Sequence, residues 1–326
     1  MYRGEIVSRA KQRLAMQKAD KESQYHQRLQ EAYAKLPRLK EIDLLLRKSM
    51  TLAAMAVFTD RDHSEETMAK AKEENIALQQ ERKDLLNKHF APDFLDESPI
   101  CPHCGGSGYV GSTMCSCLKN LCCEEQKKAL RQLTTGTEQF ENFRLDFYPQ
   151  RVYREYGASP RTIMERNFNT CRQYATAFEQ GIGNLLFVGS TGLGKTYLSA
   201  CIANVVTDKG FSVAYESAPQ LFGKLEKNRF SPDEESRAEA EYFEKCDLLI
   251  IDDLGTEMPS NFVTAALYSL LNQRLLDGKC MLISTNLNTE DFDKRYSPQI
   301  ASRIHGNFTI MPFVGEDIRV MKKRGI

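Results

Sequence analysis

The hydrophobic and polar positions divide the chain into a helical first part and a mixed second part. Residues 1 to about 92 are rich in Ala, Leu, Gln, Glu, Lys and Arg, and they show no strand-like alternation of apolar and polar positions. This composition favours helices. We therefore expect three helices, over roughly 5–34, 39–58 and 64–89.

The middle helix of this first part carries an apolar stripe. We interpret the stripe as the seam of a small helical bundle. A bundle this thin leaves apolar positions uncovered, so the stripe is also a candidate surface for a partner protein. Its members are Ile42, Leu45, Leu46, Leu52 and Met55.

From Pro160 onward, short apolar runs alternate with helical patterns, as they do in an α/β sheet. Three runs have the length and composition of buried strands, namely residues 185–188, 248–251 and 280–284. Parallel strands bring their carboxyl ends to one edge of a sheet, where α/β proteins bind ligands. The predicted fold class of this part is α/β with a parallel sheet.

The first of these strands leads into Gly-Ser-Thr-Gly-Leu-Gly-Lys-Thr at residues 189–196, followed by a helical stretch. This is the spacing of a phosphate-binding loop, in which successive backbone N–H groups point inward at phosphate. Lys195 would reach the β- and γ-phosphate oxygens, and the Thr196 hydroxyl would bind Mg²⁺. An ordinary Gly-rich turn is the alternative. The predicted ATP-binding residues are Gly189, Ser190, Thr191, Gly192, Leu193, Gly194, Lys195 and Thr196.

Polar residues also follow the other two strands. The second strand ends in Asp252, our candidate for the second Mg²⁺ ligand, and Asp253, our candidate for the base that orients and polarises the attacking water. Two solvated acids capping a strand are the alternative. The third strand is followed by Thr285 and Asn286, whose amide could hydrogen-bond the γ-phosphate or the water. A Thr-Asn pair also commonly starts a turn.

Six of the ten cysteines lie between residues 101 and 123. Two close pairs flank a Gly-rich turn, and each pair can offer two thiolates to one tetrahedral ion, for which Zn²⁺ is the usual occupant. Four thiolates leave no open position, so we expect a structural site. The alternatives are a disulfide, a 2Fe–2S cluster, or replacement of Cys117 by Cys122 or Cys123. The predicted zinc ligands are Cys101, Cys104, Cys115 and Cys117, with His103 outside the ligand set.

The overall charge favours no particular partner, because Lys plus Arg and Asp plus Glu both total 44. The first fifty residues hold 12 basic and 6 acidic side chains, a surplus typical of a solvated face and less often of phosphate binding. No apolar run approaches the roughly 18 residues of a membrane span, and no signal peptide opens the chain. Scattered cysteines outside the cluster suggest a reducing compartment. We expect a cytoplasmic protein without membrane contact.

Four segments together resemble the DnaC/DnaI family of bacterial replicative helicase loaders. They are residues 137–143, 171–175, 183–196 and 248–255. The family consists of AAA+ ATPases, and the insertion-sequence helper ATPase IstB belongs to the same branch. The resemblance covers roughly residues 137–326. The cysteine cluster resembles that of DnaI-like loaders, whose N-terminal domain carries zinc and contacts the helicase, whereas the first ninety residues carry no motif that matches.

The resemblance implies two further site residues. Arg303 lies in a segment similar to the one whose arginine enters a neighbouring subunit's nucleotide pocket, although a surface ion pair explains it equally and Arg295 is a nearby rival. Arg319 lies in a segment similar to the one whose arginine contacts the γ-phosphate of its own subunit. The chain ends seven residues beyond Arg319, short of a typical AAA+ helical lid. We therefore expect self-association only on a partner.

A basic and aromatic segment, residues 221–230, precedes an acidic run around Asp233. It could hold single-stranded DNA through phosphate contacts and stacking, and an amphipathic surface helix explains the same residues.

These inferences give a predicted organisation and function. The predicted parts are a helical region that binds a helicase (1–95), a zinc module (96–123), a connector (124–160) and an AAA+ ATPase domain (161–326). We predict an ATP-hydrolysing loader of the replicative DNA helicase that also contacts single-stranded DNA. The alternatives are an IstB-like transposition helper and an ATP-gated adaptor that does not hydrolyse ATP. A P-loop kinase fits least, because neither an acceptor site nor a lid can be read.

Overall fold

The computed structural model describes residues 2–59, 64–133 and 137–323. The described chain separates into two compact units, one formed by Gln12–Cys115 and the other by the residues before Gln12 together with those from Ser116 onward. None of the helices in the described ranges has the length and apolar character needed to cross a bilayer.

The unit Gln12–Cys115 is mainly helical. It contains most of α1 (Gly4–Lys35), with α2 (Pro37–Thr59), α3 (Ser64–His89) and a small hairpin of β1 (Tyr109–Val110) and β2 (Thr113–Met114). The three predicted helices are confirmed, and each end lies within two residues of its predicted place.

The apolar stripe of α2 is buried only in part. Leu39 and Ile42 are fully buried and Leu46 is half-buried, which follows the three-to-four spacing of one helix face. Leu45 is 42% exposed, because one residue corresponds to about 100° of rotation around a helix. The side chains of the other two stripe members, Leu52 and Met55, lie outside the described residues.

The second unit contains a five-stranded sheet in which every neighbouring pair is parallel. The α/β class with a parallel sheet is thus confirmed. The strand order places β6 between β5 and β3, so the carboxyl ends of these three strands lie side by side. In spatial order the strands are β4 (Val213–Ser217), β5 (Leu248–Leu254), β6 (Cys280–Thr285), β3 (Asn184–Val188) and β7 (Phe308–Pro312).

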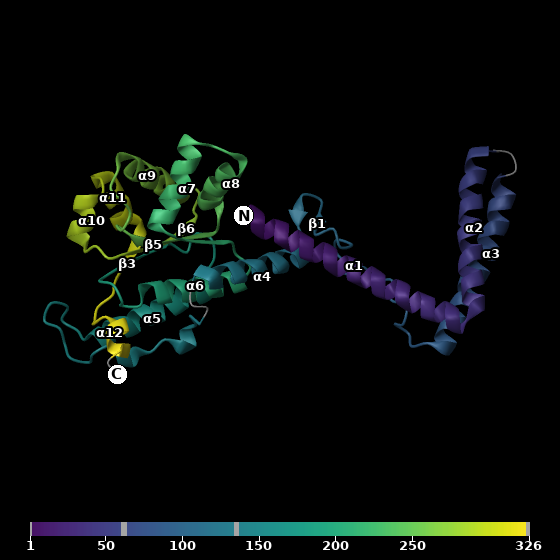
Figure 1. The fold of residues 1–326 in the computed structure, drawn as a ribbon, viewed down its shortest axis with the longest axis horizontal. Helices are drawn as coiled ribbons and strands as arrows, with labels where there is room; N and C mark the ends of the chain where they lie inside the picture. Colours follow the sequence, from purple (N-terminus) through teal and green to yellow (C-terminus); the bar gives the residue numbers. More distant parts are fainter. Residues whose placement is uncertain (1, 60–63, 134–136, 324–326) are drawn as a thin grey trace. The chain divides into compact units, whose positions relative to one another are not determined.

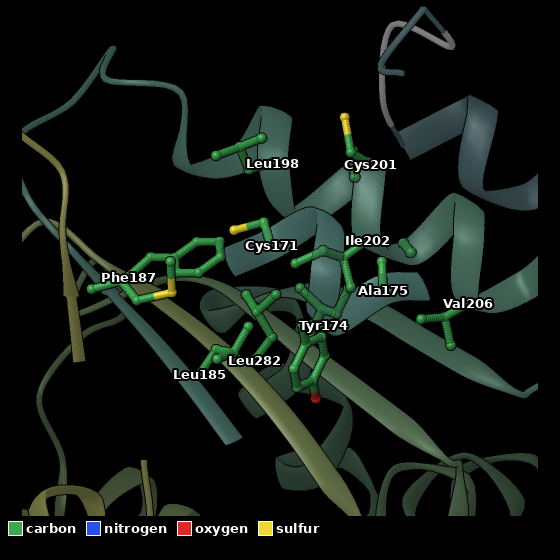
Figure 2. Packing of buried hydrophobic residues seen from close by; sticks show 14 of the residues in the cluster. Cys171, Tyr174, Ala175, Leu185, Phe187, Leu198, Cys201, Ile202, Val206 and Leu282 are labelled. Atoms are coloured by element: carbon green, nitrogen blue, oxygen red, sulfur yellow. The ribbon is translucent and has the colours of Figure 1, made fainter. Parts of the chain in front are cut away.

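Helices cover both faces of this sheet (Figure 1). Successive strand residues point to opposite faces, so Leu185 and Phe187 of β3 pack into one hydrophobic core and Leu186 into the other. The first core contains α5 (Pro160–Thr176) and α6 (Lys195–Asp208), and Figure 2 shows Cys171, Tyr174 and Ile202 of these helices around Leu185 and Leu282. The second core contains α7 (Ala218–Phe230), α8 (Glu234–Lys245), α9 (Asn261–Leu276), α10 (Thr289–Arg295) and α11 (Pro298–Asn307).

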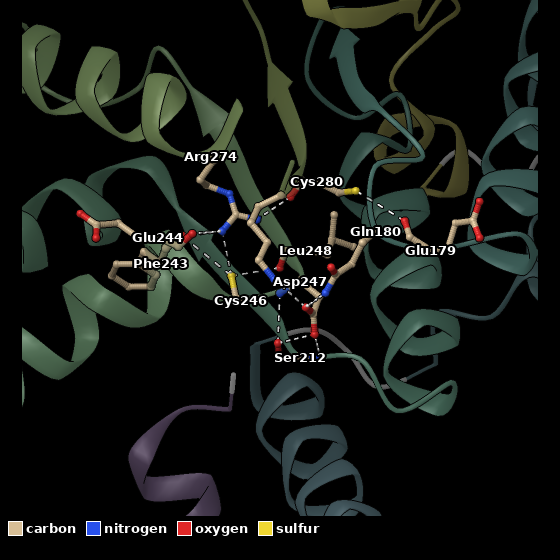
Figure 3. Close-up of polar contacts among 11 residues, drawn as sticks. Glu179, Gln180, Ser212, Phe243, Glu244, Cys246, Asp247, Leu248, Arg274 and Cys280 are labelled. Carbon is tan, nitrogen blue, oxygen red and sulfur yellow. Dashed lines mark hydrogen bonds and ion pairs between the residues drawn. The ribbon is translucent and has the colours of Figure 1, made fainter. Parts of the chain in front are cut away.

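A buried arginine and a half-buried aspartate fix the amino ends of the strands (Figure 3). Arg274 is fully buried, and its guanidinium donates to the carbonyl oxygens of Phe243 at 2.7 Å and Cys280 at 2.6 Å. Asp247 accepts hydrogen bonds from the Ser212 hydroxyl at 2.8 Å and from Lys279 at 3.0 Å. Since β5 and β6 begin beside these residues, the network holds the end of the sheet opposite the carboxyl ends of these strands.

Candidate functional site

The glycine-rich loop joins β3 to α6, as the sequence predicts. Two of its glycines lie at positions that disfavour a side chain. Gly189 has φ of 154°, and a Cβ there would lie 2.3 Å from the carbonyl oxygen of Phe313. Gly192 has φ of 75°, and its Cβ would lie 2.0 Å from a carboxylate oxygen of Asp317. At Gly189 the backbone of Phe313 leaves no room for a side chain, whereas at Gly192 the positive φ disfavours one and the carboxylate of Asp317 would have to move.

Two segments from outside the motif hold the loop in place. The hydroxyl of Tyr148, in the segment that the sequence marks as a connector, donates to the carbonyl of Leu193 at 2.9 Å. The backbone N–H of Ile318, at the start of α12 (Ile318–Lys323), donates to the carbonyl of Gly192 at 3.0 Å. Tyr148 is 2% exposed, so its hydrogen bond is shielded from water. Sequence reasoning gave Tyr148 no role, because its partner is a backbone atom 45 positions away.

Lys195 is buried at the first turn of α6. Its ammonium group donates to the carbonyls of Gly189 at 2.6 Å and Ser190 at 2.8 Å, and to Oδ1 of Asn286 at 2.6 Å. Burial lowers the pKa of Lys195, and the charges of the two neighbouring aspartates oppose that effect. A cation held this close to the loop can stabilise phosphate oxygens there.

The two candidate acids lie on a distorted part of β5. The strand continues beyond its predicted end, through Asp252 and Asp253 to Leu254. The register between β5 and β6 shifts between Ile251 and Leu254, which is the signature of a β-bulge. Asp253 has φ of 55°, and it is the one residue other than glycine with a positive φ in the described chain. The bulge was invisible in the sequence because it depends on pairing with a second strand.

The acids have different surroundings. Asp252 is 7% exposed, and its oxygens accept hydrogen bonds from the hydroxyls of Ser284 at 2.5 Å and Tyr215 at 3.1 Å. Asp253 accepts a hydrogen bond from Nδ2 of Asn286 at 3.3 Å. Burial, followed by the charge of Asp252, raises the pKa of Asp253. A carboxylate with a raised pKa is a suitable acceptor for a proton from water.

A cavity of about 270 Å³ lies against the glycine-rich loop. It gathers several predicted residues, namely Thr191, Gly192, Leu193, Gly194, Lys195, Thr196, Asp253, Asn286 and Arg319. Asp252 is not among its lining residues. The connector supplies a side that the sequence did not predict, with Asn142, Phe143, Arg144 and Phe147. In the sequence, only the aromatic residues of the 140–143 segment hinted that the connector contributes to the site.

Arg303 lies on α11, outside this cavity. Its guanidinium donates to the hydroxyl of Tyr268 at 2.8 Å and to Oδ1 of Asn272 at 3.0 Å, and it lies 4.3 Å from the centre of the Tyr268 ring. Within the part of the chain that the structure describes, no carboxylate forms an ion pair with it. The rival Arg295 forms an ion pair with Glu257 at 3.1 Å. Of the two arginines, Arg303 therefore has the charge that remains uncompensated.

The basic and aromatic segment forms α7, an amphipathic helix. Leu221 and Phe222 are buried in the second core. Lys224 pairs with Glu216 at 2.6 Å, and Lys227 pairs with Asp233 at 2.9 Å. The end of the helix is open to solvent: Phe230 is 69% exposed, and its ring lies 5.8 Å from that of Phe262.

The four cysteines predicted to bind zinc come together. Their sulfur atoms all lie within 4.8 Å of one another, and the sulfurs of Cys101 and Cys115 are 3.8 Å apart. Four sulfurs at about 2.3 Å from a tetrahedral zinc ion are about 3.8 Å from each other, so the group fits Zn²⁺. No disulfide joins any of the ten cysteines, so the disulfide alternative is wrong. Cys122 and Cys123, on α4 (Ser116–Leu133), and the exposed His103 are not part of the group.

Comparison with known proteins relates the chain to two kinds of protein, one from insertion sequences and one from DNA replication. Over 142 residues it is 27% identical to a protein described as the ATP-binding protein of insertion sequence IS232 from Bacillus thuringiensis subsp. berliner, covering 42% of this chain and 56% of that protein. Over 133 residues it is 23% identical to the replicative helicase loader DnaC of Escherichia coli (strain K12), covering 41% and 54%. The matches span little more than half the length of these relatives.

Solved structures give similar neighbours. The crystal structure of the DnaC helicase loader matches 54% of this chain and 98% of its own, with 21% identity and a TM-score of 0.45. The crystal structure of DnaI matches 47% and 85%, with 21% identity and a TM-score of 0.42. A family model of IstB-like ATP-binding proteins matches residues 125–323, which is more than half of the chain. The chain thus belongs to the family of IstB-like ATP-binding proteins and is homologous to the DnaC helicase loader.

Proposed function

We propose that the protein is an ATP-hydrolysing loader of a replicative DNA helicase. The observation that carries the ATPase part is the contact of Asn286 with both Lys195 and Asp253 at the edge of the loop cavity. A phosphate-binding cation, a polar amide and a candidate base thus converge where the γ-phosphate of ATP would lie.

Each group has a role in the proposed hydrolysis. The loop amides and Lys195 hold the phosphates, and Arg319 offers a second cation. Thr196 and Asp252 would hold Mg²⁺, which would neutralise phosphate charge when bound. Asp253 accepts a proton from the water whose oxygen bonds to the γ-phosphorus. The bond from that phosphorus to the β–γ bridging oxygen breaks, leaving ADP and phosphate.

In the proposed loader, the rest of the chain also has roles. The helical region before the cysteines would bind the helicase, and zinc held by the four cysteines would stabilise that segment. The solvent-exposed end of α7, with Arg229 and Phe230, would contact single-stranded DNA by charge and stacking. For Arg303 to enter the nucleotide pocket of a neighbouring subunit, copies of the chain would have to assemble on the partner. The proposal also places the protein in the cytoplasm.

A transposition helper is the second candidate. The IstB-like family match and the relative from insertion sequence IS232 support it. The cysteine cluster favours the loader, because it resembles the cluster of DnaI-like loaders. Both candidates use the same ATPase core, so the partner distinguishes them.

Affinity purification of the tagged full-length protein from host lysate, with ATP and followed by mass spectrometry, tests the proposal. Recovery of a hexameric helicase by the wild type and its loss with Lys195→Ala would support the loader. Recovery of a transposase instead would favour the helper. Phosphate release is then measured with the recovered partner and single-stranded DNA. ATP binding without phosphate release would indicate an adaptor and contradict the ATPase role.

A further inference from the structure

One hydroxyl group touches both candidate acids. Ser284, in β6, is fully buried. Its Oγ accepts a hydrogen bond from the backbone N–H of Asp253 at 2.9 Å and donates one to Oδ1 of Asp252 at 2.5 Å. Both the single proton and an acceptor lone pair of this hydroxyl are therefore used on adjacent residues.

The bulge in β5 explains why a hydroxyl is needed there. Parallel strands normally pair each N–H with a carbonyl of the neighbouring strand. The register shift after Ile251 removes Asp253 from that ladder, and a buried N–H without a partner is costly. Ser284 supplies an oxygen in place of the missing carbonyl. The next residue of β6 acts on the same bulge, because the hydroxyl of Thr285 donates to the carbonyl of Leu254 at 2.6 Å.

The same bond fixes which acid faces the cavity. With φ of 55°, Asp253 has a backbone conformation that is unfavourable for a residue with a side chain. In that conformation its carboxylate meets Asn286 and lines the cavity, whereas Asp252 turns to Tyr215. A regular strand would also place two successive side chains on opposite faces. The bulge differs because Asp253 has a left-handed conformation, which the hydrogen bond to Ser284 holds in place.

We propose that Ser284 is a positioning residue that holds the bulge and thereby aims Asp253 at the water that attacks ATP. This inference rests on the proposed ATPase function. Removing the hydroxyl leaves the phosphate-binding groups in place but frees the backbone of Asp253. The loss should therefore appear in turnover and not in nucleotide affinity.

Ser284→Ala is compared with Ser199→Ala. Ser199, in α6, is also fully buried, and its hydroxyl has no hydrogen-bond partner among the described residues. Ser284→Ala should lower kcat about 100-fold, as expected for a misplaced catalytic group, with ATP affinity within about threefold of wild type. Ser199→Ala should change neither. If Ser284→Ala does not fold, Ser284→Cys takes its place, because a thiol fills the space but hydrogen-bonds weakly.

A double mutant separates positioning from general damage to the fold. If Ser284 acts through Asp253, then Ser284→Ala should add less than about threefold to the loss caused by Asp253→Asn. Multiplicative losses would overturn the proposal, and so would a Ser284 variant with the turnover of Ser199→Ala.

Hydrogen–deuterium exchange tests the structural part without ATP hydrolysis. Amides of the peptide that contains Asp252–Leu254 should exchange at least about tenfold faster in Ser284→Ala than in wild type and Ser199→Ala. Unchanged exchange would overturn the inference. A wild type that releases no phosphate would refute the proposed ATPase function instead, and exchange would still decide the role of Ser284 in the bulge.

Discussion

Oδ1 of Asn286 lies 2.6 Å from Nζ of Lys195, although the two residues are 91 positions apart in the chain. Lys195 follows β3 and Asn286 follows β6, and these strands are direct neighbours in the sheet. The bond thus joins the phosphate-binding loop to the strand beside it, and through Asn286 to Asp253. The candidate site exists only because the sheet places these strands in this order.

Lys195→Ala should abolish detectable ATP binding. The substitution removes the cation that the loop surrounds. Water that fills the vacated space carries no positive charge to stabilise the phosphates. Titration calorimetry with ATP and Mg²⁺ measures the effect. Lys119→Ala, at an exposed position of α4, is the control and should bind as wild type does. Retained affinity in Lys195→Ala would show that nucleotide binds elsewhere.

Asp253→Asn should keep ATP binding and slow hydrolysis by roughly two to four orders of magnitude, as expected for loss of a general base. It should also raise the melting temperature. The pKa of Asp253 is raised in the folded protein, so folding disfavours the charged carboxylate. The stability contributed by the neutral carboxyl group is present below the pKa of an unfolded aspartate and is lost as pH rises through the higher pKa of the folded protein. A neutral amide avoids that cost and tolerates a positive φ. Equal loss of binding in Asp253→Asn and Lys195→Ala would mean that their roles are wrongly assigned.

Arg319→Gln should move the acidic limb of the pH–rate profile to higher pH. A base must be deprotonated to act, so turnover falls as pH drops through the pKa of Asp253. Burial and Asp252 raise that pKa, while Lys195, Asn286 and Arg319 lower it. Removing Arg319 takes away one of the lowering influences. Turnover at saturating ATP is compared with Arg172→Gln, an exposed arginine on α5. An unmoved limb would exclude a charge of Arg319 acting at Asp253.

Purified protein should contain about one zinc ion per chain, and Cys104→Ser should lose it and destabilise the helical unit. Elemental analysis and thermal unfolding measure the two effects. Cys123→Ser is the matched control, because its sulfur lies outside the group of four, 3.2 Å from the hydroxyl of Tyr2. Finding iron, or no metal in protein with four reactive thiols, would contradict the zinc site.

Arg303 should act in a neighbouring subunit if it acts in catalysis at all, since it does not line the cavity of its own chain. ATPase activity per chain should then rise with protein concentration or on single-stranded DNA. Mixing Arg303→Ala with Lys195→Ala should restore part of the activity, because one chain has an intact pocket and the other an intact arginine. Arg295→Gln is not expected to be complemented in this way, as Arg295 is tied to Glu257. Normal, concentration-independent turnover of Arg303→Ala would remove the trans mechanism.

The sequence by itself determined the local features of this protein. Composition and periodicity were enough for the three N-terminal helices, because helix formation depends on residues close in the chain. The glycine-rich loop and the cysteine pairs were also predictable, since each needs fixed spacing within a short segment. Gly189 to Gly194 lie between β3 and α6, and Lys195 and Thr196 begin α6, as the motif requires.

Only the tertiary structure decided how distant residues meet. The strand order brings Asn286 to Lys195, the bulge separates Asp252 from Asp253, and Tyr148 reaches the loop from the connector. None of these contacts follows a period or a motif, because each depends on pairing or packing between segments far apart in the chain. Ser284 shows this most clearly: it follows an apolar run in its strand, and its significance comes from the two acids that the neighbouring strand places beside it.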